Sequence, residues 1–522
     1  MKIVILGGGS AGWMTASALI KSFPDYDVTV VDKEDGAPIG VGESTINGIR
    51  NFCNFLGIDE KDFLTQTDGS YKLAIQFKDF ERVGSEAFLY PFGSPDTSGT
   101  SMGLQDWLLK KYSYPDTPVT DFAESFFPAA LMVKHKVFFK DVPDESLSSY
   151  NSDIGLAYHF DAIKFAQWLQ NNYAIPRGVK HLKEEFDYAV KGENETIKYF
   201  VTKTEVKIEA DLFVDCSGFS SLLLGLSLNE PFISYADLLP NSSAIATQLP
   251  YKDKEKELIP VTTCTAIENG WVWNIPLWSR VGSGYVYSPE FITDEYALDE
   301  FVEYLMSDRS GVPRDLEDIK ELKFKKLTFR TGIHKRTWVG NVVAIGLSAG
   351  FIEPLESSGL YTVHEFLFQL LRALSKGAPT QWDKDTYNVS TYSLFNEFAE
   401  FVALHYALSK RTDTPYWEKL SRKSYVSLSK KEPSVFEEII KAKTVTSLIP
   451  QTGGYPYILV GMNYLPLDNI SAFIGEKERK VTYSKEYRDL ISYLTSRRSY
   501  WDSIISKQMS LHNYLKTNVY YE

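Results

Sequence analysis

The chain is 522 residues long and carries a formal net charge of −13. This length allows about two to four domains and a core large enough to enclose a cofactor. The composition, 44% hydrophobic and 24% charged, is that of an ordinary globular protein rather than a disordered or membrane protein. The negative charge argues against a nucleic-acid partner, because such binding depends on clustered Lys and Arg side chains that face phosphates.

The cysteines and the apolar runs predict the compartment. Three cysteines lie far apart in the sequence and form neither a disulfide framework nor a zinc motif, so we expect a reducing cytoplasm. The apolar run 3–6 is too short for a signal peptide and ends in a glycine turn. The run 342–352 is interrupted by glycine and serine and falls well short of the ~20 residues that span a membrane. We therefore expect no membrane segment, while a homo-oligomer remains open.

In chain order, the first predicted elements are a strand at 2–6, a helix at about 11–21 and a strand at 28–31. The turn between the first two, Gly7-Gly8-Gly9-Ser10-Ala11-Gly12, fits G-x-G-x-x-G, whose glycines permit a tight turn and close approach to a pyrophosphate. Asp32 ends the second strand, where a carboxylate can bind a ribose hydroxyl. This context favours a dinucleotide site over a merely tight turn, but it does not distinguish FAD from NAD.

Further along, two kinds of strand and then helices are predicted. Runs at 212–214 and 342–345 lead into glycine-containing turns and are expected to join the first sheet. Between them, the runs 262–266, 270–275 and 284–287 alternate aromatic or β-branched residues, as antiparallel strands do. Apolar residues then recur at helical spacing from Leu360 to Leu374 and from Leu394 to Tyr406, so the last third is predicted to be mostly helical.

Several segments together resemble the flavin-dependent halogenases of the tryptophan halogenase type. The nucleotide turn 9–14, the loop 40–45 and the segment 215–219 are similar to the parts of that family that contact flavin. Gly270-Trp271-Val272-Trp273-Asn274-Ile275-Pro276 matches the GWxWxIP pattern that separates these halogenases from related aromatic hydroxylases. Without its flanks, the Trp271 and Trp273 pair would be interpreted as aromatic filling of one strand face. The segments 349–360, 405–406 and 411–417 extend the match.

The resemblance implies an α/β fold. It consists of a Rossmann-like FAD-binding domain of the flavoprotein monooxygenase type, a β-sheet substrate layer and a mostly helical C-terminal region. We predict an FAD-binding module over 1–375, with substrate-side insertions at about 75–210 and 230–335, and a helical region over 376–522 that completes the substrate site. FAD acts as FADH2, and the residues implied to bind it are Gly7, Gly8, Gly9, Ser10, Ala11, Gly12, Asp32, Lys33, Ile39, Val41, Ser44, Leu347 and Leu360.

The resemblance also implies the chemistry: reduced FAD, O2 and halide give hypohalous acid, which halogenates a separate aromatic substrate. Lys72 corresponds to the lysine that holds the hypohalous acid or becomes a haloamine, and Glu356 to the carboxylate that orients the electrophile and accepts a proton. Considered alone, Lys72 would be a solvated surface lysine, and Glu356 would offset the dipole of the following helix. The free amides around Ser358 and Gly359 are predicted to bind halide.

The remaining predictions concern the substrate side and the partners. Leu347 would touch the flavin ring, and Ser357 and Leu360 would lie between the flavin and the tunnel. The residues implied on the substrate side are Ser357, Trp271, Trp273, Tyr90 and Phe92. Relatives carry His where this chain has Tyr90, so the substrate need not be tryptophan. The expected partners are a small aromatic substrate of indole or phenol type, halide, O2 and a separate NAD(P)H-dependent flavin reductase.

A histidine and a cysteine outside these assignments have simpler interpretations. His159, beside aromatic residues, is interpreted as a packed, hydrogen-bonded histidine, and Cys216 as a small buried residue without a neighbouring base. No His/Cys/carboxylate set at ligand spacing is found, so no metal is predicted. Two alternative functions remain: an aromatic monooxygenase that transfers oxygen directly to its substrate, and a non-catalytic protein that binds FAD.

Overall fold

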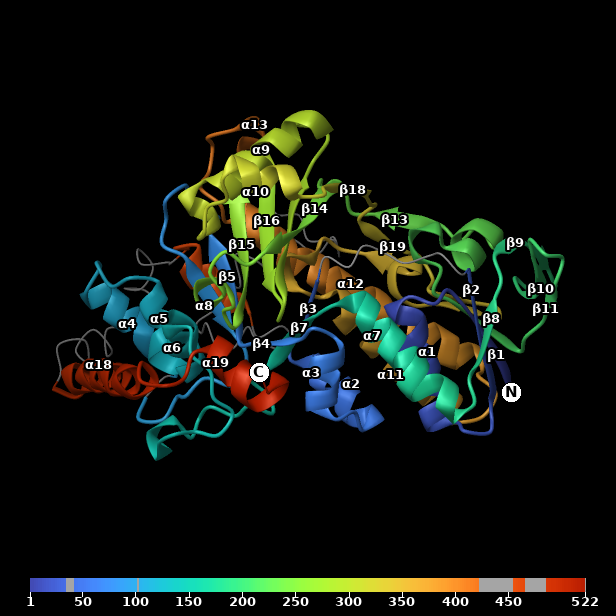
Figure 1. The fold of residues 1–522 in the computed structure, drawn as a ribbon, viewed down its shortest axis with the longest axis horizontal. Coiled ribbons are helices and arrows are strands. Elements are labelled where there is room, and N and C mark those ends of the chain that lie inside the picture. Colours follow the sequence, from blue (N-terminus) through green and yellow to red (C-terminus); the bar gives the residue numbers. More distant parts are fainter. Residues whose placement is uncertain (34–41, 101–102, 422–453, 465–484, 522) are drawn as a thin grey trace.

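The computed structural model describes residues 1–33, 42–100, 103–421, 454–464 and 485–521 (Figure 1). Its fold is mixed α/β, built on two large sheets that lie on different sides of the molecule. One buried hydrophobic cluster runs through the core beneath both sheets. The elements that carry the candidate site therefore share a single packed core, which holds them in fixed relative positions.

The first sheet holds the predicted nucleotide motif. Its strand order is β20-β21-β12-β1-β2-β8, and neighbouring strands are parallel except for the antiparallel pair at β20 and β21. The bounds are β1 Lys2–Leu6, β2 Asp27–Asp32, β8 Lys180–Lys183, β12 Leu212–Asp215, β20 Trp338–Val339 and β21 Val342–Ala344. Helices α1 (Ser10–Ser22) and α11 (Gly359–Leu374) pack against each other. The predicted parallel sheet from distant segments is confirmed.

The second sheet is mostly antiparallel, with strand order β18-β14-β17-β16-β15-β5-β6. Its bounds are β5 Ala74–Lys78, β6 Phe88–Pro91, β14 Ser243–Pro250, β15 Val261–Ile267, β16 Gly270–Pro276, β17 Arg280–Tyr287 and β18 Lys325–Thr328. The strands predicted at 262–266, 270–275 and 284–287 are β15, β16 and β17, paired antiparallel as expected. Strand β15 pairs with β16, which carries the GWxWxIP segment, and also with β5, the strand that follows Lys72.

Three smaller sheets connect the large ones. The sheet β3-β7-β4 lies between the nucleotide turn and the second sheet, and its last strand ends at Lys72. The bounds are β3 Glu43–Ser44, β4 Ser70–Lys72 and β7 Ala157–Phe160; β9 Phe186–Lys191, β10 Ile197–Thr202 and β11 Lys207–Ile208; and β13 Phe232–Ser234, β19 Gly332–His334 and β22 Gly350–Phe351. Because β8 pairs with β2 from within the predicted 75–210 insertion, the segments interleave closely.

Helices make up most of the described C-terminal part. The long helix α12 (Gln381–Ala407) packs on α11, and α18 (Lys485–Ile505) packs on α5 and α6 (Figure 1). The other helices are α2 Gly48–Leu56, α3 Glu60–Gln66, α4 Gln105–Ser113, α5 Thr120–Phe126, α6 Pro128–His135, α7 Ala162–Trp168, α8 Lys254–Glu257, α9 Asp294–Met306, α10 Leu316–Glu321, α13 Pro415–Ser421, α15 Tyr455–Gly461 and α19 Leu511–Leu515. Among the described residues, no helix is both long and apolar enough to cross a bilayer.

Candidate functional site

The glycine turn has the shape that a bound dinucleotide requires. Gly7 has φ of +113°, in the region that favours glycine, and a Cβ on Gly12 would lie 1.9 Å from the Gly7 carbonyl oxygen. A Cβ on Gly9 would meet no described atom within 4 Å, so among the described residues this glycine borders open space at the N-terminus of α1. The turn therefore combines tight packing on one side with room on the other. That arrangement fits the pyrophosphate of FAD.

Asp32 lies beside this turn, where a ribose hydroxyl would be bound. A Cβ on Gly8 would approach its carboxylate to 2.3 Å, and the Gly8 amide is among its hydrogen-bond donors. Burial raises the pKa of Asp32, while the Gly8 amide, His181 and Lys33 act in the opposite direction. Lys33 is described, whereas the predicted contacts Ile39 and Val41 lie outside the described residues.

The segment after β12 closes the turn from the other side. The carbonyl oxygen of Cys216 lies where a Cβ on Gly7 would be. Asp215 holds the segment in place, because its carboxylate accepts hydrogen bonds from Ser217 and from the amides of Leu223 and Leu224. Burial raises the pKa of the Cys216 thiol far above its usual value. Cys216 is therefore a buried packing residue, as predicted, and not a nucleophile.

Lys72 is fully buried, in contrast to the usual surface position of lysine. Its ammonium donates three hydrogen bonds, to Ser44 Oγ at 2.9 Å, the Thr45 carbonyl at 2.8 Å and Ser357 Oγ at 2.9 Å. All three acceptors are neutral. The structure thus brings together the predicted catalytic lysine, the predicted flavin contact Ser44 and the predicted tunnel residue Ser357.

The surroundings of Lys72 change its protonation. Burial lowers the pKa of Lys72 to about 7, while Cys264, Glu356 and Glu43 act to raise it. Its ammonium also lies 5.0 Å from the centre of the Phe92 ring. At neutral pH, Lys72 is consequently present both as an ammonium, which donates hydrogen bonds, and as an amine, which is a nucleophile.

A chain of neutral hydrogen bonds leads from Ser44 into the protein. Ser44 Oγ lies 2.6 Å from Thr262 Oγ1, which lies 2.7 Å from His159 Nε2, and His159 Nδ1 is 3.4 Å from Ser70 Oγ. Burial and the charge of Lys72 hold the pKa of His159 well below its usual value. His159 is thus a neutral, packed and hydrogen-bonded residue, as predicted, and it orients the groups that hold Lys72.

Glu356 is buried and faces a histidine that the sequence did not assign to the site. Glu356 Oε1 lies 2.8 Å from His405 Nε2, although the contact is off the axis of a regular hydrogen bond. His405 Nδ1 donates to the carbonyl of Phe401 one turn earlier in α12. Both side chains are buried, so this close contact fixes the carboxyl group of Glu356 against α12. Glu356 therefore belongs to a buried Glu–His pair and not merely to a helix N-terminus.

The first tryptophan of the GWxWxIP pattern supports the segment that carries Glu356. Trp271 was predicted on the substrate side, but it is fully enclosed, and its indole N–H donates to Glu353 Oε2 at 2.9 Å. The same oxygen accepts hydrogen bonds from Asn241 and Tyr406. Trp273 packs over Gly284, where a Cβ would lie 2.2 Å from its ring. The structure thus links Trp271 to the segment that carries Glu356, and its place on the substrate side stays a prediction.

Aromatic rings form a wall next to the Lys72 and Glu356 groups. The Tyr90 ring lies 6.1 Å from Phe92, stacks at 5.5 Å on Tyr457 and contacts Phe401 at 6.2 Å. Burial, followed by the charge of Glu356, raises the pKa of Tyr90 well above its usual value, so its hydroxyl stays neutral. The predicted substrate-side residues Tyr90 and Phe92 therefore lie beside the predicted catalytic pair, joined by residues of α12 and α15.

The predicted halide residues lie at the start of α11. Ser358 caps this helix and Gly359 is its first residue, after Ser357 with φ of 55°. A Cβ on Gly359 would be 3.6 Å from Glu43 Oε1. Burial raises the pKa of Glu43 to about 7, although Lys72 acts to lower it. Glu43 is therefore partly protonated at neutral pH.

The two predicted leucine contacts of the flavin differ in exposure, and three further residues of the site were not predicted. Leu347 is 42% exposed, as a residue that faces a cofactor space would be, whereas Leu360 is 7% exposed. His405, Glu43 and Cys264 also lie in or beside the site, and no sequence motif assigned them a role there. The resemblance included the 405–406 segment, but only the packing of α12 shows that His405 faces Glu356. Among the described residues, no group of three or more His, Cys, Asp or Glu could hold a metal.

Comparisons with known proteins agree with this geometry. The family model for tryptophan halogenase matches residues 2–472. Tryptophan 6-halogenase SttH of Streptomyces toxytricini is 35% identical over 436 residues, which cover 80% of each chain. Tryptophan 7-halogenase RebH of Lentzea aerocolonigenes is 35% identical over 429 residues, which cover 80% of this chain and 78% of RebH.

The likeness extends to the whole fold. The solved apo structure of VirX1 matches with a TM-score of 0.90 at 33% identity, covering 100% of this chain and 99% of that one. A tryptophan C-6 flavin-dependent halogenase, Tar14, matches with a TM-score of 0.80 at 32% identity, covering 98% of this chain and 99% of Tar14. The expected α/β fold is confirmed. The chain therefore belongs to the tryptophan halogenase family and is an FAD-dependent halogenase.

Proposed function

We propose that this halogenase converts halide and O2 to hypohalous acid at FADH2 and halogenates an electron-rich aromatic of indole or phenol type. The observation that carries the proposal is the fully buried Lys72, whose pKa is about 7 although Glu356 acts to raise it, and whose ammonium lies 5.0 Å from the centre of the Phe92 ring. An ordinary structural lysine would be exposed or paired with a carboxylate. Here its three acceptors are neutral, so no carboxylate holds the charge, and one of the three hydrogen bonds can be exchanged for a hydrogen bond to an incoming electrophile.

Reduced FAD, when bound, supplies the two electrons with which O2 and halide yield hypohalous acid. In our proposal the residues around Gly7 to Gly12, with Asp32 and Lys33, hold the nucleotide, and Leu347 lies against the ring. The amides of Ser358 and Gly359 bind the halide, because a helix N-terminus attracts an anion. The reductant comes from a separate NAD(P)H-dependent flavin reductase, because the sequence contains only one nucleotide motif.

Lys72 is proposed to control the electrophile. As an ammonium it donates a hydrogen bond to hypohalous acid. As an amine it takes the halogen, forming an N–X bond while hydroxide leaves with the amine proton as water. Ser44 and Ser357, each within 2.9 Å of Nζ, hold the side chain so that it reaches the electrophile in one orientation.

Glu356 is proposed as the general base for the last step. When the halogen has added to the ring, the carboxylate takes the ring proton and aromaticity returns. His405 keeps the carboxyl group in place from the side away from the substrate. Because Tyr90 and Phe92 lie next to this pair, the aromatic substrate is expected to stack there.

The location and the domain limits are part of the proposal. Cys53, Cys216 and Cys264 are free and buried, which suits a reducing cytoplasm. The division at about residue 375 between an FAD-binding module and a helical region is consistent with α11 ending at Leu374 and α12 beginning at Gln381. In this view, α12 and α15 complete the substrate site through Phe401 and Tyr457.

The test is a product assay with the protein, FAD, a flavin reductase, NADH, bromide or chloride, and a panel of indoles and phenols. We expect products heavier by one halogen in place of one hydrogen, detected by mass spectrometry. Lys72→Ala and Glu356→Gln are each expected to lower the rate at least about tenfold, because proton transfer by a positioned group is commonly worth about 10²–10⁴. Lys21→Ala, an exposed residue of α1, is the matched control and should be unchanged.

Other outcomes have definite meanings. A hydroxylated product that persists without halide would make the protein an aromatic monooxygenase. Bound FAD without turnover of any substrate in the panel would favour the non-catalytic alternative. Unchanged turnover in both the Lys72 and Glu356 variants would refute the site assignment even if halogenation itself were observed.

A further inference from the structure

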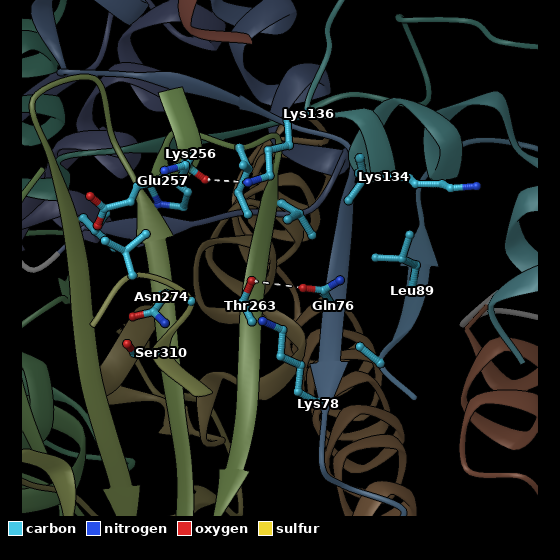
Figure 2. A pocket seen from close by; sticks show the side chains of 18 of the residues that line it. Gln76, Lys78, Leu89, Lys134, Lys136, Lys256, Glu257, Thr263, Asn274 and Ser310 are labelled. Carbon is cyan, nitrogen blue, oxygen red and sulfur yellow. Dashed lines mark hydrogen bonds between the residues drawn. The ribbon is translucent and has the colours of Figure 1, made fainter. Parts of the chain in front are cut away.

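A separate cavity lies on the other face of the seven-stranded sheet. Its volume is about 480 Å³, and its residues come from β5, β15 and β16, with others from α6, α8 and the segment 310–314 (Figure 2). Side chains alternate along a strand, so Thr263 faces this cavity while its neighbours Thr262 and Cys264 face the Lys72 side. Gln76 and Lys78 flank Phe77 in the same way, and Phe77 packs on His405.

Lys78 places an uncompensated positive charge in this cavity. Within the described residues its ammonium makes no hydrogen bond or ion pair, although it projects from the sheet into the cavity (Figure 2). Lys136 faces the same space, and within the described part of the chain its ammonium donates to the carbonyl of Lys256 alone, at 3.1 Å. Burial lowers the pKa of Lys78; the neighbouring Asp79 raises it, and Lys136 lowers it further. Neither ammonium forms an ion pair with a carboxylate among the described residues, although both face this cavity.

The acidic groups on the surrounding elements are occupied elsewhere. Each one is held by a different donor or cation: Glu86 by the amide of Val119, Glu124 by Lys134 and Arg498, Glu257 by Arg314, and Asp79 by Arg309. Another lining lysine, Lys134, pairs with Glu124 and Asp502, and its ammonium points away from the cavity (Figure 2). The charge that remains uncompensated is thus local to Lys78 and Lys136.

The rest of the lining suits a ligand with an apolar body. Apolar side chains cover much of the wall, and they include Leu89, Val133, Leu249, Ile259, Val261 and Leu305. Polar groups of the sheet lie between them, where Thr263 Oγ1 is 3.5 Å from Gln76 Oε1. Asn274 Oδ1 is buried and has no hydrogen-bond partner among the residues that the structure describes. Cavities of this size that combine apolar walls with a few convergent polar groups are typical of ligand sites. A shallow, water-filled depression of the surface does not require that combination.

We propose that this cavity binds a small organic anion, whose phosphate or carboxylate group is held by Lys78 and whose apolar body packs against the Leu89 and Leu305 side of the wall, while Lys136 adds positive charge from another part of the same cavity (Figure 2). A charge-assisted hydrogen bond from an ammonium to an anionic group belongs to the strong class of such contacts. The site is distinct from the halogenation site, because β5 and β15 separate the two. An occupant would contact the strand whose opposite face holds Thr262 and Cys264.

The probe is phenyl phosphate, which combines a dianionic group with an apolar ring. Calorimetric titration of the FAD-loaded enzyme is expected to show one bound equivalent. Lys78→Met should weaken binding at least about tenfold, since it removes the charged donor, and Lys136→Met should weaken binding by a smaller factor, since it removes a more distant positive charge. Lys134→Met is the matched control, because it lines the same cavity while its ammonium is engaged outside it, and its affinity should stay within about twofold of the parent.

Parallel titrations separate the two parts of the ligand. Inorganic phosphate should bind more weakly than phenyl phosphate because it lacks the apolar body, and phenol should not bind at the cavity because it lacks the charge. Benzoate, tested alongside, distinguishes a carboxylate ligand from a phosphate ester. A crystal structure of the complex should place the phosphate group against Lys78 Nζ.

The proposal is overturned if phenyl phosphate does not bind at millimolar concentrations, if the Lys78 and Lys136 variants retain full affinity, or if the crystal shows it only at another site. Unchanged thermal unfolding of each variant establishes that lost binding is not lost folding. If Lys78→Met does not fold, Lys78→Gln and the crystal structure decide. Halogenation by the same variants is measured separately, so this result is independent of the proposed function.

Discussion

At the scale of single residues, the protein keeps a fully buried lysine among neutral oxygen atoms. Lys72 receives its acceptors from Ser44, Thr45 and Ser357, which lie 28, 27 and 285 positions away in the chain. Carboxyl groups nearby offset only part of the cost of burial, because the pKa of Lys72 still falls to about 7. The chain thus accepts a loss of stability at the position where we propose the electrophile is controlled.

The stability of the protein should therefore depend on pH through Lys72. Its pKa is about 7 in the folded protein against a model value of 10.5, so between these values the unfolded chain binds more protons and the free energy of unfolding rises with pH. Measured by urea unfolding relative to Lys72→Met, the parent should gain stability on the order of a few kcal/mol across this range. Below about pH 7 the difference should level off.

An exposed lysine provides the control for this measurement. Lys21→Met on α1 should show no such relative gain, because that side chain is in water in both states. A difference between the parent and Lys72→Met that stays flat from neutral to alkaline pH would contradict a lowered pKa for Lys72.

At the scale of elements, the glycine turn before α1 contains glycines with different tasks. Gly12 is needed for packing, because a Cβ there would overlap the Gly7 carbonyl oxygen. Gly9 has φ of −76° and ψ of −172°, a conformation that any residue can adopt, and it borders open space. The fold therefore does not require glycine at position 9. A ligand that must approach the backbone closely there does explain it.

Alanine substitutions should separate these tasks. Gly9→Ala is expected to leave the thermal unfolding of the FAD-free protein unchanged while weakening FAD binding at least about tenfold, because its methyl group occupies space the pyrophosphate needs. Gly12→Ala should lower the unfolding temperature even without FAD. Flavin fluorescence titration and calorimetry measure both effects, and equal behaviour of the two variants would show that Gly9 does not face the cofactor.

The link between β16 and the turn at 353–356 is another element-scale feature. Trp271 on β16 is one of three donors to the buried Glu353 carboxylate, and Glu353 precedes Glu356 by three residues. All three donors are buried. The position of the 353–356 turn therefore depends on these buried hydrogen bonds and not on contacts at the protein surface. Through Trp271 and Glu353, the GWxWxIP strand therefore helps to position Glu356, the proposed general base, without contacting it.

Removing the indole donor should test this link. Trp271→Phe is expected to destabilise the protein by about 1–3 kcal/mol, the usual cost of leaving a buried acceptor short of a partner, and to lower kcat more than it changes KM. Trp382→Phe on α12 is the matched control, because Trp382 is 77% exposed. A loss confined to KM would instead indicate that Trp271 contacts the substrate directly.

At the scale of the whole molecule, the C-terminal end is fastened under the strand that carries Lys72. The Tyr520 ring stacks on Trp278 at 4.2 Å, and its hydroxyl donates to the carbonyls of Leu64 and Gly69, the latter just before β4. These groups lie 456 and 451 residues from Tyr520. The last residues of the chain therefore help to position one of the first functional strands.

Tyr520→Phe is expected to lower the free energy of unfolding by about 1 kcal/mol through the lost hydrogen bond. Tyr520→Ala should cost about 2 kcal/mol or more, because the stacked ring is lost as well, and it should reduce the halogenation rate. Tyr188→Ala on β9, where the side chain is 52% exposed, should have little effect. Equal stability of the Tyr520→Ala variant and the parent would show that the C-terminal end is not needed to hold β4.

Much of the fold was predictable from local patterns. The first strand, the glycine turn and α1 follow from the steric demands of a short strand-to-helix connection. The alternation in β15 and β16 and the helical spacing in α11 and α12 follow from periods of two and 3.6 residues. Lys72, Glu356 and Tyr90 were proposed for the site by resemblance, and the structure places all three near one another.

By itself the sequence determined the dinucleotide turn, the order of strands and helices, and the residue types available for halogenation. Only the tertiary structure decided that Lys72 is buried with a lowered pKa, that Glu356 faces His405, and that Trp271 donates a hydrogen bond to Glu353. The physical reason is that desolvation and close polar contacts depend on segments tens to hundreds of residues apart. No local pattern in the chain specifies such contacts.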